Sequence, residues 1–136
     1  TDAQAKEIAD VMEVRRMLEG QAVRLACTRR TADNIREITA ILEETNKRLS
    51  KKQSIEREDE AFHLAIFSAT KNDILLRVAR SFYELSRHRR KVYFADQNRG
   101  RQSYEDHCTI LEAIEERRVG QAGEQMNAHR WRTEEA

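Results

Sequence analysis

Proline is absent from this chain, and glycine occurs at only 4 of its 136 positions. Sheet-rich folds need turn residues every few positions, so this scarcity argues against them and favours helices. Cysteine is also scarce, and two residues are too few for a disulfide scaffold. Because Cys27 and Cys108 both stand among helix-forming residues, we predict that they are buried small side chains in a reduced, cytoplasmic protein.

An excess of either charge is missing as well. The chain has 25 basic and 24 acidic residues, and its formal net charge of +1 does not favour a nucleic acid or a membrane surface as a partner. The charges are interleaved, which is typical of solvated helix faces, and we interpret the cluster from Arg87 to Lys91, including His88, as an exposed helix end. No apolar run approaches the roughly 20 residues of a membrane-spanning helix, and no signal peptide is visible.

The spacing of apolar residues predicts six helices within a single domain. They cover about residues 5–29, 31–49, 55–70, 73–94 and 103–117, with a last helix after a break at 118–120. Thr31 is the predicted N-cap of the second helix, and residues 50–54 and 96–102 are the predicted loops. The apolar residues predicted to face the core include Ile8, Ile74, Val78, Leu85 and Val119.

Three of the four histidines fall on the predicted apolar faces. His63 is followed by Ile66 three positions on, His107 precedes Ile110 at the same spacing, and His129 follows Met126. Three separate helices therefore each point an imidazole toward the interior. Asp59 stands four residues before His63, which puts both side chains on one face of a helix, a turn apart.

A carboxylate and an imidazole one turn apart can bind the same ion. Neutral imidazole suits zinc, nickel, iron and copper, and a carboxylate widens the choice to harder ions such as manganese. Three histidines and one aspartate leave one or two positions open on a five- or six-coordinate ion, as a catalytic or ligand-capturing site requires. For each residue alone, a core histidine satisfied by a neighbour is the simpler interpretation, but the set of four favours a metal.

Arg15 is the second residue of interest, because it lies between Met12 and Leu18 on an inward face. A buried guanidinium needs a partner. Glu19, one turn on, is one candidate, and the carboxylate of a ligand, bound by two hydrogen bonds, is the other. The sequence leaves these two interpretations open.

These residues lie in motifs that resemble the FCD domain, the effector-binding C-terminal domain of the FadR branch of GntR-type bacterial transcription regulators. The segment from Glu13 to Glu19 is similar to the opening E-x-R-x-x-[IL]-E motif, and the segment from Asp59 to His63 is similar to D-x-x-F-H. The segment from His107 to Ile114 resembles H-x-x-I-L-x-A-I, and the segment from Ala122 to His129 resembles A-x3-M-x2-H. The resemblance covers nearly the whole chain, and the ordered set of four ligands is its most specific part.

The chain departs from the family pattern at three places, none of which is a ligand. Asp106 stands where the family usually has Glu, and Lys71 stands where glycine is common. Arg117 and Arg118 stand where a Gly-Asp pair usually opens the last helix.

The resemblance implies an all-α antiparallel bundle of about six helices with a central cavity, spanning residues 1–136. It also implies one divalent transition metal ion, zinc first, with nickel, manganese or iron as alternatives; its ligands would be Asp59, His63, His107 and His129. The expected effector is a small organic acid whose carboxylate completes the metal's coordination shell. Further cavity residues are Arg15, Asn72 and Arg87, although Asn72 can instead be a helix cap and Arg87 a surface residue.

The family also forms homodimers and carries a winged helix-turn-helix domain before this one. The chain begins at Thr1 and has no such domain, so we expect it to be the effector-sensing part of a longer regulator. It would reach DNA only through the missing domain. The residues also allow a metal-dependent enzyme, or a structural bundle without metal, but no interior acid or base stands out beside the ligands, which favours a sensor.

Overall fold

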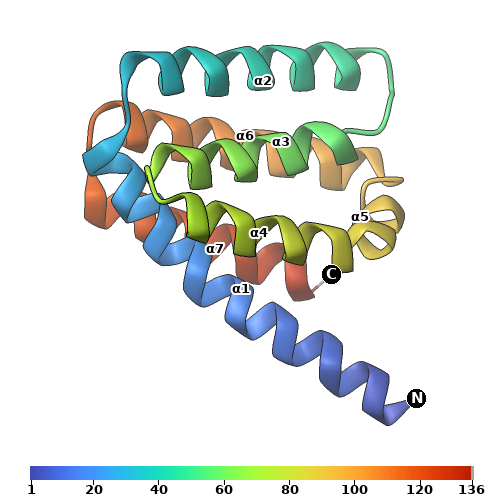
Figure 1. The fold of residues 1–136 in the computed structure, drawn as a ribbon. Coiled ribbons are helices and arrows are strands. Elements are labelled where there is room, and N and C mark those ends of the chain that lie inside the picture. Colours follow the sequence, from blue (N-terminus) through green and yellow to red (C-terminus); the bar gives the residue numbers. More distant parts are fainter. Residues whose placement is uncertain (136) are drawn as a thin grey trace.

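The computed structural model describes residues 1–135 of the chain (Figure 1). Within these residues it contains seven α-helices and no strand, which confirms the predicted fold class. The helices are α1 (Asp2–Arg29), α2 (Ala32–Ser50), α3 (Glu56–Ala69), α4 (Asp73–Leu85), α5 (Arg87–Tyr93), α6 (Gln97–Glu115) and α7 (Val119–Glu135). In this part of the chain, none of the helices combines the length and the apolar character that crossing a membrane requires.

Polar side chains just before α2 and α4 fix where these helices begin. The Thr31 hydroxyl accepts a hydrogen bond from the Asn34 backbone N–H, and the Asn34 side chain accepts one from the Thr31 N–H. Asn72 Oδ1 accepts from the Leu75 backbone N–H at 3.0 Å. Each bond satisfies a donor that the first turn of a helix leaves without an intrahelical partner, and the predicted Thr31 cap is confirmed.

The predicted loop at residues 96–102 is wrong. α6 begins at Gln97, because the Asp96 carboxylate accepts hydrogen bonds from the backbone N–H groups of Asn98 and Arg99, and the helix continues through Gly100. A Cβ at position 100 would lie 3.1 Å from Leu49 Cδ2. The glycine therefore allows α6 to pack closely against α2 and is not a turn residue.

The helix predicted over residues 73–94 is also divided in two, at Ser86. The break buries the Arg90 guanidinium beneath the end of α4, where its Nη2 donates to the Tyr83 carbonyl oxygen and to Glu60 Oε1, both at 2.8 Å. Apolar spacing does not reveal this break, because helix formers stand on both sides of it. Seven helices therefore replace the six that were predicted.

The core lies between α1, α2, α3, α6 and α7. α1 packs against α7 and α3, and α2 packs against α3 and α6, while α4 lies on the outside of the bundle (Figure 1). Cys27 is buried in this core, as predicted, and Cys108 is only partly buried at its margin. The largest core cluster is formed by Val23, Ala26, Cys27, Ile38, Leu42, Phe62, Ala65, Ile66, Ala69, Ile110, Ala113, Ile114, Ala122 and Met126.

Five apolar residues that were predicted to face the core are exposed. They are Ile8 on α1, the three α4 residues Ile74, Val78 and Leu85, and Val119 at the start of α7. The first turns of α1 project beyond the bundle (Figure 1), and α4 buries only one side, with Ala79 and Tyr83. Helical spacing places residues on a common face, but it does not say whether another helix covers that face.

Candidate metal centre

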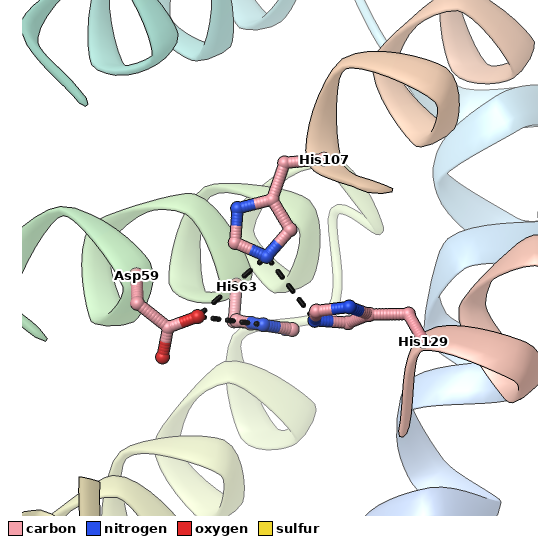
Figure 2. A group of neighbouring side chains, drawn as sticks. All are labelled: Asp59, His63, His107 and His129. Atoms are coloured by element: carbon pink, nitrogen blue, oxygen red, sulfur yellow. Dashed lines mark hydrogen bonds and ion pairs between the residues drawn. The ribbon is translucent and has the colours of Figure 1, made fainter. Parts of the chain in front are cut away.

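Four buried side chains from three helices converge at one point in the bundle (Figure 2). Asp59 and His63 come from α3, His107 comes from α6 and His129 comes from α7. One ligand atom from each of the four lies within 4.8 Å of every other. The convergence that the sequence predicted is therefore present in the structure.

The three imidazoles present the same nitrogen to this point. His107 Nε2 lies 3.2 Å from His129 Nε2, and Asp59 Oδ1 lies 3.3 Å from His63 Nε2 and 3.6 Å from His107 Nε2. Within the described residues, neither ring nitrogen of His63 makes a hydrogen bond of good geometry, although both are fully buried and each lies against a carboxylate oxygen.

This donor set fits a divalent transition metal. A buried polar atom without a hydrogen bond carries a desolvation cost, which coordination to an ion removes. Three imidazole nitrogens and one carboxylate oxygen are ligands that suit zinc and its neighbours, and they leave coordination positions open. The site can therefore both hold an ion and expose it to a further ligand.

Carboxylates contact the second ring nitrogen of two of these histidines. Glu19 Oε1 on α1 lies 2.6 Å from His63 Nδ1, and Asp106 Oδ2 on α6 lies 2.8 Å from His129 Nδ1. From the sequence, Glu19 is expected only as a partner of Arg15, and Asp106 is not expected as a partner of His129. No local signal reveals either contact, because each forms only where two helices pack together.

The third imidazole is held by an aromatic contact. The Phe62 ring stacks on the His107 ring, with centroids 3.9 Å apart and an interplanar angle of 8°. Phe62 itself is fully buried in the core cluster. The orientation of His107 is therefore set by packing with the residue that precedes His63 in the chain.

The acidic groups of the site stay ionised. Burial by itself would raise the pKa of Asp59, but the charge and hydrogen bond of His63 and the charge of Arg15 lower it well below its ordinary range. Burial likewise acts to raise the pKa of Glu19, and the charges of His63, Arg15 and Arg130 overcome it. Two permanent negative charges therefore face the imidazoles from opposite ends of His63.

The imidazoles divide into two groups. Burial acts to lower the pKa of His63, but its two carboxylate neighbours, Glu19 and Asp59, raise it overall. Burial lowers the pKa of His107, and the charge of His63 adds to this effect. Burial also lowers the pKa of His129, although its bond to Asp106 acts in the opposite direction. His107 and His129 therefore stay neutral in the form that binds metals.

Arg15 is fully buried, and the predicted contact with Glu19 is found, whereas its contact with a ligand carboxylate stays a prediction. Its Nε lies 3.5 Å from Glu19 Oε2, and its Nη2 donates to the Tyr83 hydroxyl at 2.9 Å. The same side chain lines a cavity of about 30 Å³ that also reaches Asp59. Arg15 is therefore paired within the protein and also forms part of the wall of the cavity beside Asp59.

Three further arginines, which are not among the predicted cavity residues, line this cavity. Arg130 follows His129 on α7, and its Nε lies 3.0 Å from Glu19 Oε2. Arg89 and Arg90 come from α5, which covers one side of the cavity. The space beside Asp59 is therefore bordered by cationic groups, which is a suitable environment for an anion.

The remaining predicted cavity residues lie elsewhere. Asn72 is exposed and caps α4, and Arg87 is exposed, with its Nη2 3.7 Å from Glu60 Oε1. Neither residue lines the cavity beside Asp59. Their roles as effector contacts stay predictions. His88 is exposed, as predicted.

A sequence model of the FCD domain matches residues 10–131, which is most of the chain. The chain belongs to the FCD domain family. Among curated relatives, the HTH-type transcriptional regulator LutR of Bacillus subtilis is 30% identical to this FCD domain in an alignment of 129 residues that covers 91% of the chain and 59% of LutR. The Nta operon transcriptional regulator of Aminobacter aminovorans is also 30% identical, over 93% of the chain and 59% of its own length. The chain thus spans about three fifths of these relatives.

Solved structures share the fold of this FCD domain. Escherichia coli McbR/YncC superposes with a TM-score of 0.83 at 18% identity, over 93% of this chain and 65% of that one. A GntR family transcriptional regulator from Pseudomonas syringae superposes with a TM-score of 0.69 at 21% identity, over 93% of this chain and 53% of its own. At these identities, the similarity supports the fold alone.

Proposed function

We propose that this FCD domain is the effector-sensing part of a GntR-type transcription regulator of the FadR branch. It binds one divalent transition metal ion, zinc first, with nickel, manganese or iron as alternatives. The observation that carries the proposal is the convergence of Asp59, His63, His107 and His129 on one buried point. The names of the relatives, which are transcription regulators, support the same class of function.

The proposed effector is a small organic acid. When bound, the metal supplies Lewis acidity and open coordination positions to a carboxylate. Arg15 and Arg130 line the cavity next to Asp59 and offer hydrogen-bond donors to the same anion. Because the cavity has a volume of only about 30 Å³, an effector larger than a water or two needs its arginine walls to move.

The contacts of the buried acidic side chains favour a sensor over a metal-dependent enzyme. Each of the three buried acids beside the histidines is already engaged: Asp59 contacts two imidazoles, Glu19 contacts His63 and Arg130, and Asp106 contacts His129 and Arg132. A general acid or base needs a group that is free to exchange a proton with a substrate.

The regulator is proposed to act as a homodimer. Apolar residues on the outer face of α4 are exposed, and an interface between two copies would bury them. The effector would shift the packing of the bundle against its partner, and DNA would be reached through a domain that lies outside this chain. Such a shift requires the effector to bind one arrangement more tightly than the other.

The first experiment is elemental analysis of protein purified without a histidine tag and supplemented in turn with zinc, nickel and manganese. We expect one equivalent of metal per chain. Metal-loaded protein is then screened with mono-, di- and tricarboxylic acids, and an acid that binds the folded state raises the melting temperature.

The variant His107→Ala tests the site directly, and His88→Ala is its matched control, because His88 is an exposed histidine away from the cluster. We expect His107→Ala to weaken metal retention by more than about 10-fold and to abolish the shift caused by acids. His88→Ala should retain both. If neither metal nor acid binding changes in His107→Ala, or if wild-type protein takes up none of the three metals, the proposed site is wrong.

A further inference from the structure

In two of the three converging histidines, a carboxylate on another helix contacts the ring nitrogen Nδ1. Glu19 of α1 contacts His63 of α3, and Asp106 of α6 contacts His129 of α7. In both pairs the carboxylate lies against Nδ1, and Nε2 of the same ring faces the common point. The arrangement thus repeats at two helix pairs that are unrelated in sequence.

This geometry decides which nitrogen can bind a metal. A carboxylate at Nδ1 favours the tautomer with its proton on Nδ1, which leaves the lone pair on Nε2. The same contact fixes the plane of the ring and makes Nε2 a stronger donor. Without it, an imidazole can rotate or change tautomer, and both changes weaken coordination.

The two carboxylates are themselves held in place. Arg132 Nη2 donates to Asp106 Oδ1 at 2.6 Å, and Gln102 Nε2 donates to the same oxygen at 3.2 Å. Asp106 Oδ2, which contacts His129, also accepts from Arg132 Nε at 3.2 Å. Asp106 is therefore oriented by two neighbours before any ion is present.

Glu19 is held by a different set of groups. Arg130 Nε lies 3.0 Å from Glu19 Oε2, and the Tyr83 hydroxyl donates to Glu19 Oε1. Arg15 Nε lies 3.5 Å from Oε2. Because Arg15 and Arg130 also line the cavity, Glu19 connects a metal-facing histidine to the arginines on which an anion would settle.

We propose that Glu19 and Asp106 are positioning residues of the metal centre, each fixing one histidine for coordination through Nε2. The inference rests on the proposed metal site and deepens it. Asp106 acts on the metal alone, whereas Glu19 acts on the metal and on the arginines beside it. A change at Asp106 therefore affects metal affinity first.

The test uses the Asp106 series, because this residue lies at the rim of the site and its loss leaves Arg132 exposed to water rather than buried. Zinc affinity is measured by competition with a chelator for wild-type protein, Asp106→Ala, Asp106→Asn and Asp106→Glu. We expect Asp106→Ala to bind zinc about 10- to 100-fold more weakly. Asp106→Asn, which retains an acceptor without the charge, should be intermediate, and Asp106→Glu should recover most of the affinity.

A second readout separates positioning from a general loss of stability. Cobalt(II) replaces zinc, and its visible absorption spectrum at saturation reports the coordination geometry. We expect the spectrum to change in Asp106→Ala and to return toward that of the wild type in Asp106→Glu. The matched control is Glu58→Ala, which removes an ion pair to Arg48 at 3.2 Å and touches no imidazole. It should leave the affinity and the spectrum unchanged.

Glu19→Gln is the companion variant, and circular dichroism shows whether it folds with two buried arginines left without their carboxylate. If it folds, it should bind zinc about 10- to 100-fold more weakly. If it does not fold, the Asp106 series decides the question. Wild-type protein that binds neither zinc nor cobalt would overturn the proposed function together with this inference. Wild-type binding with unchanged affinity and spectrum in Asp106→Ala would overturn the inference alone.

Discussion

His63 shows how a charged interior is tolerated in a chain this small. Its ring is fully buried between Asp59 and Glu19, and the two carboxylates raise its pKa although burial alone would lower it. His107 and His129 have no comparable pair of acids, and burial keeps them neutral. Three histidines of the same type therefore hold different charges, because their neighbours differ.

This difference predicts how metal-stripped protein responds to acid. The pKa values of His107 and His129 are lowered in the folded protein. Below the ordinary histidine pKa of about 6.5, these two residues therefore bind protons in the unfolded chain but not in the folded chain, so acid favours unfolding. The pKa of His63 is raised in the folded protein. The stability that its protonated ring contributes is therefore fully present below about pH 6.5 and is lost only as the pH rises through the folded pKa. Asp59 and Glu19 have lowered pKa values and stay ionised throughout this range.

The destabilising effect of acid at His107 and His129 is thus larger than the stabilising effect at His63. The free energy of unfolding should therefore fall between pH 7 and pH 5 by on the order of 1 kcal/mol or more. Urea titrations of the metal-stripped protein at the two pH values measure it. Equal or greater stability at pH 5 would contradict the assignment of neutral His107 and His129.

At the scale of the elements, close packing decides where the helices lie. α6 approaches α2 at Gly100, where a Cβ would meet Leu49 at 3.1 Å, whereas a Cβ at Gly120 in α7 would meet nothing within 4 Å. The two glycines are alike in the sequence, and only the packing of the helices distinguishes them.

Gly100→Val should therefore destabilise the protein by about 1–3 kcal/mol, because the added methyl groups overpack the contact between α6 and α2. The matched control Gly120→Val should change the free energy of unfolding by less than about 0.5 kcal/mol. Both values come from denaturant unfolding monitored by circular dichroism. Equal effects of the two variants would mean that Gly100 does not mark a close helix contact.

At the scale of the whole molecule, the outer face of α4 is exposed and apolar, and no other helix in residues 1–135 covers it. Ile74, Val78 and Leu85 are exposed along it, although Ala79 and Tyr83 on its other side are buried. Exposed apolar residues that gather on one helix face are typical of a surface that another protein covers. The proposed homodimer supplies such a cover.

The double variant Ile74→Glu with Val78→Glu should convert a dimer to a monomer, because four added carboxylates per dimer would face an apolar partner. Light scattering after size exclusion measures the mass. Val119→Glu, which places the same charge on an exposed apolar residue of α7, is the control and should stay dimeric. A monomeric wild type, or a double variant that keeps the dimer mass, would rule out this interface.

The sequence by itself determined the fold class and the four converging residues. Helical spacing is a local property, so the absence of proline, the Thr31 cap and the four-residue step from Asp59 to His63 were sufficient to predict helices and the faces that carry histidine. The family motifs added the order of the ligands. These predictions needed no knowledge of how distant segments meet.

Only the tertiary structure decided which carboxylates contact the histidines of the site and which apolar faces are covered by another helix. Asp106 meets His129, and Glu19 meets His63, across pairs of packed helices, so no spacing along the chain reveals them. The break at Ser86 and the course of α6 through Gly100 depend in the same way on contacts with Tyr83 and Leu49. Local periodicity orients a side chain on its own helix, but the neighbour that it meets is set by how the helices pack.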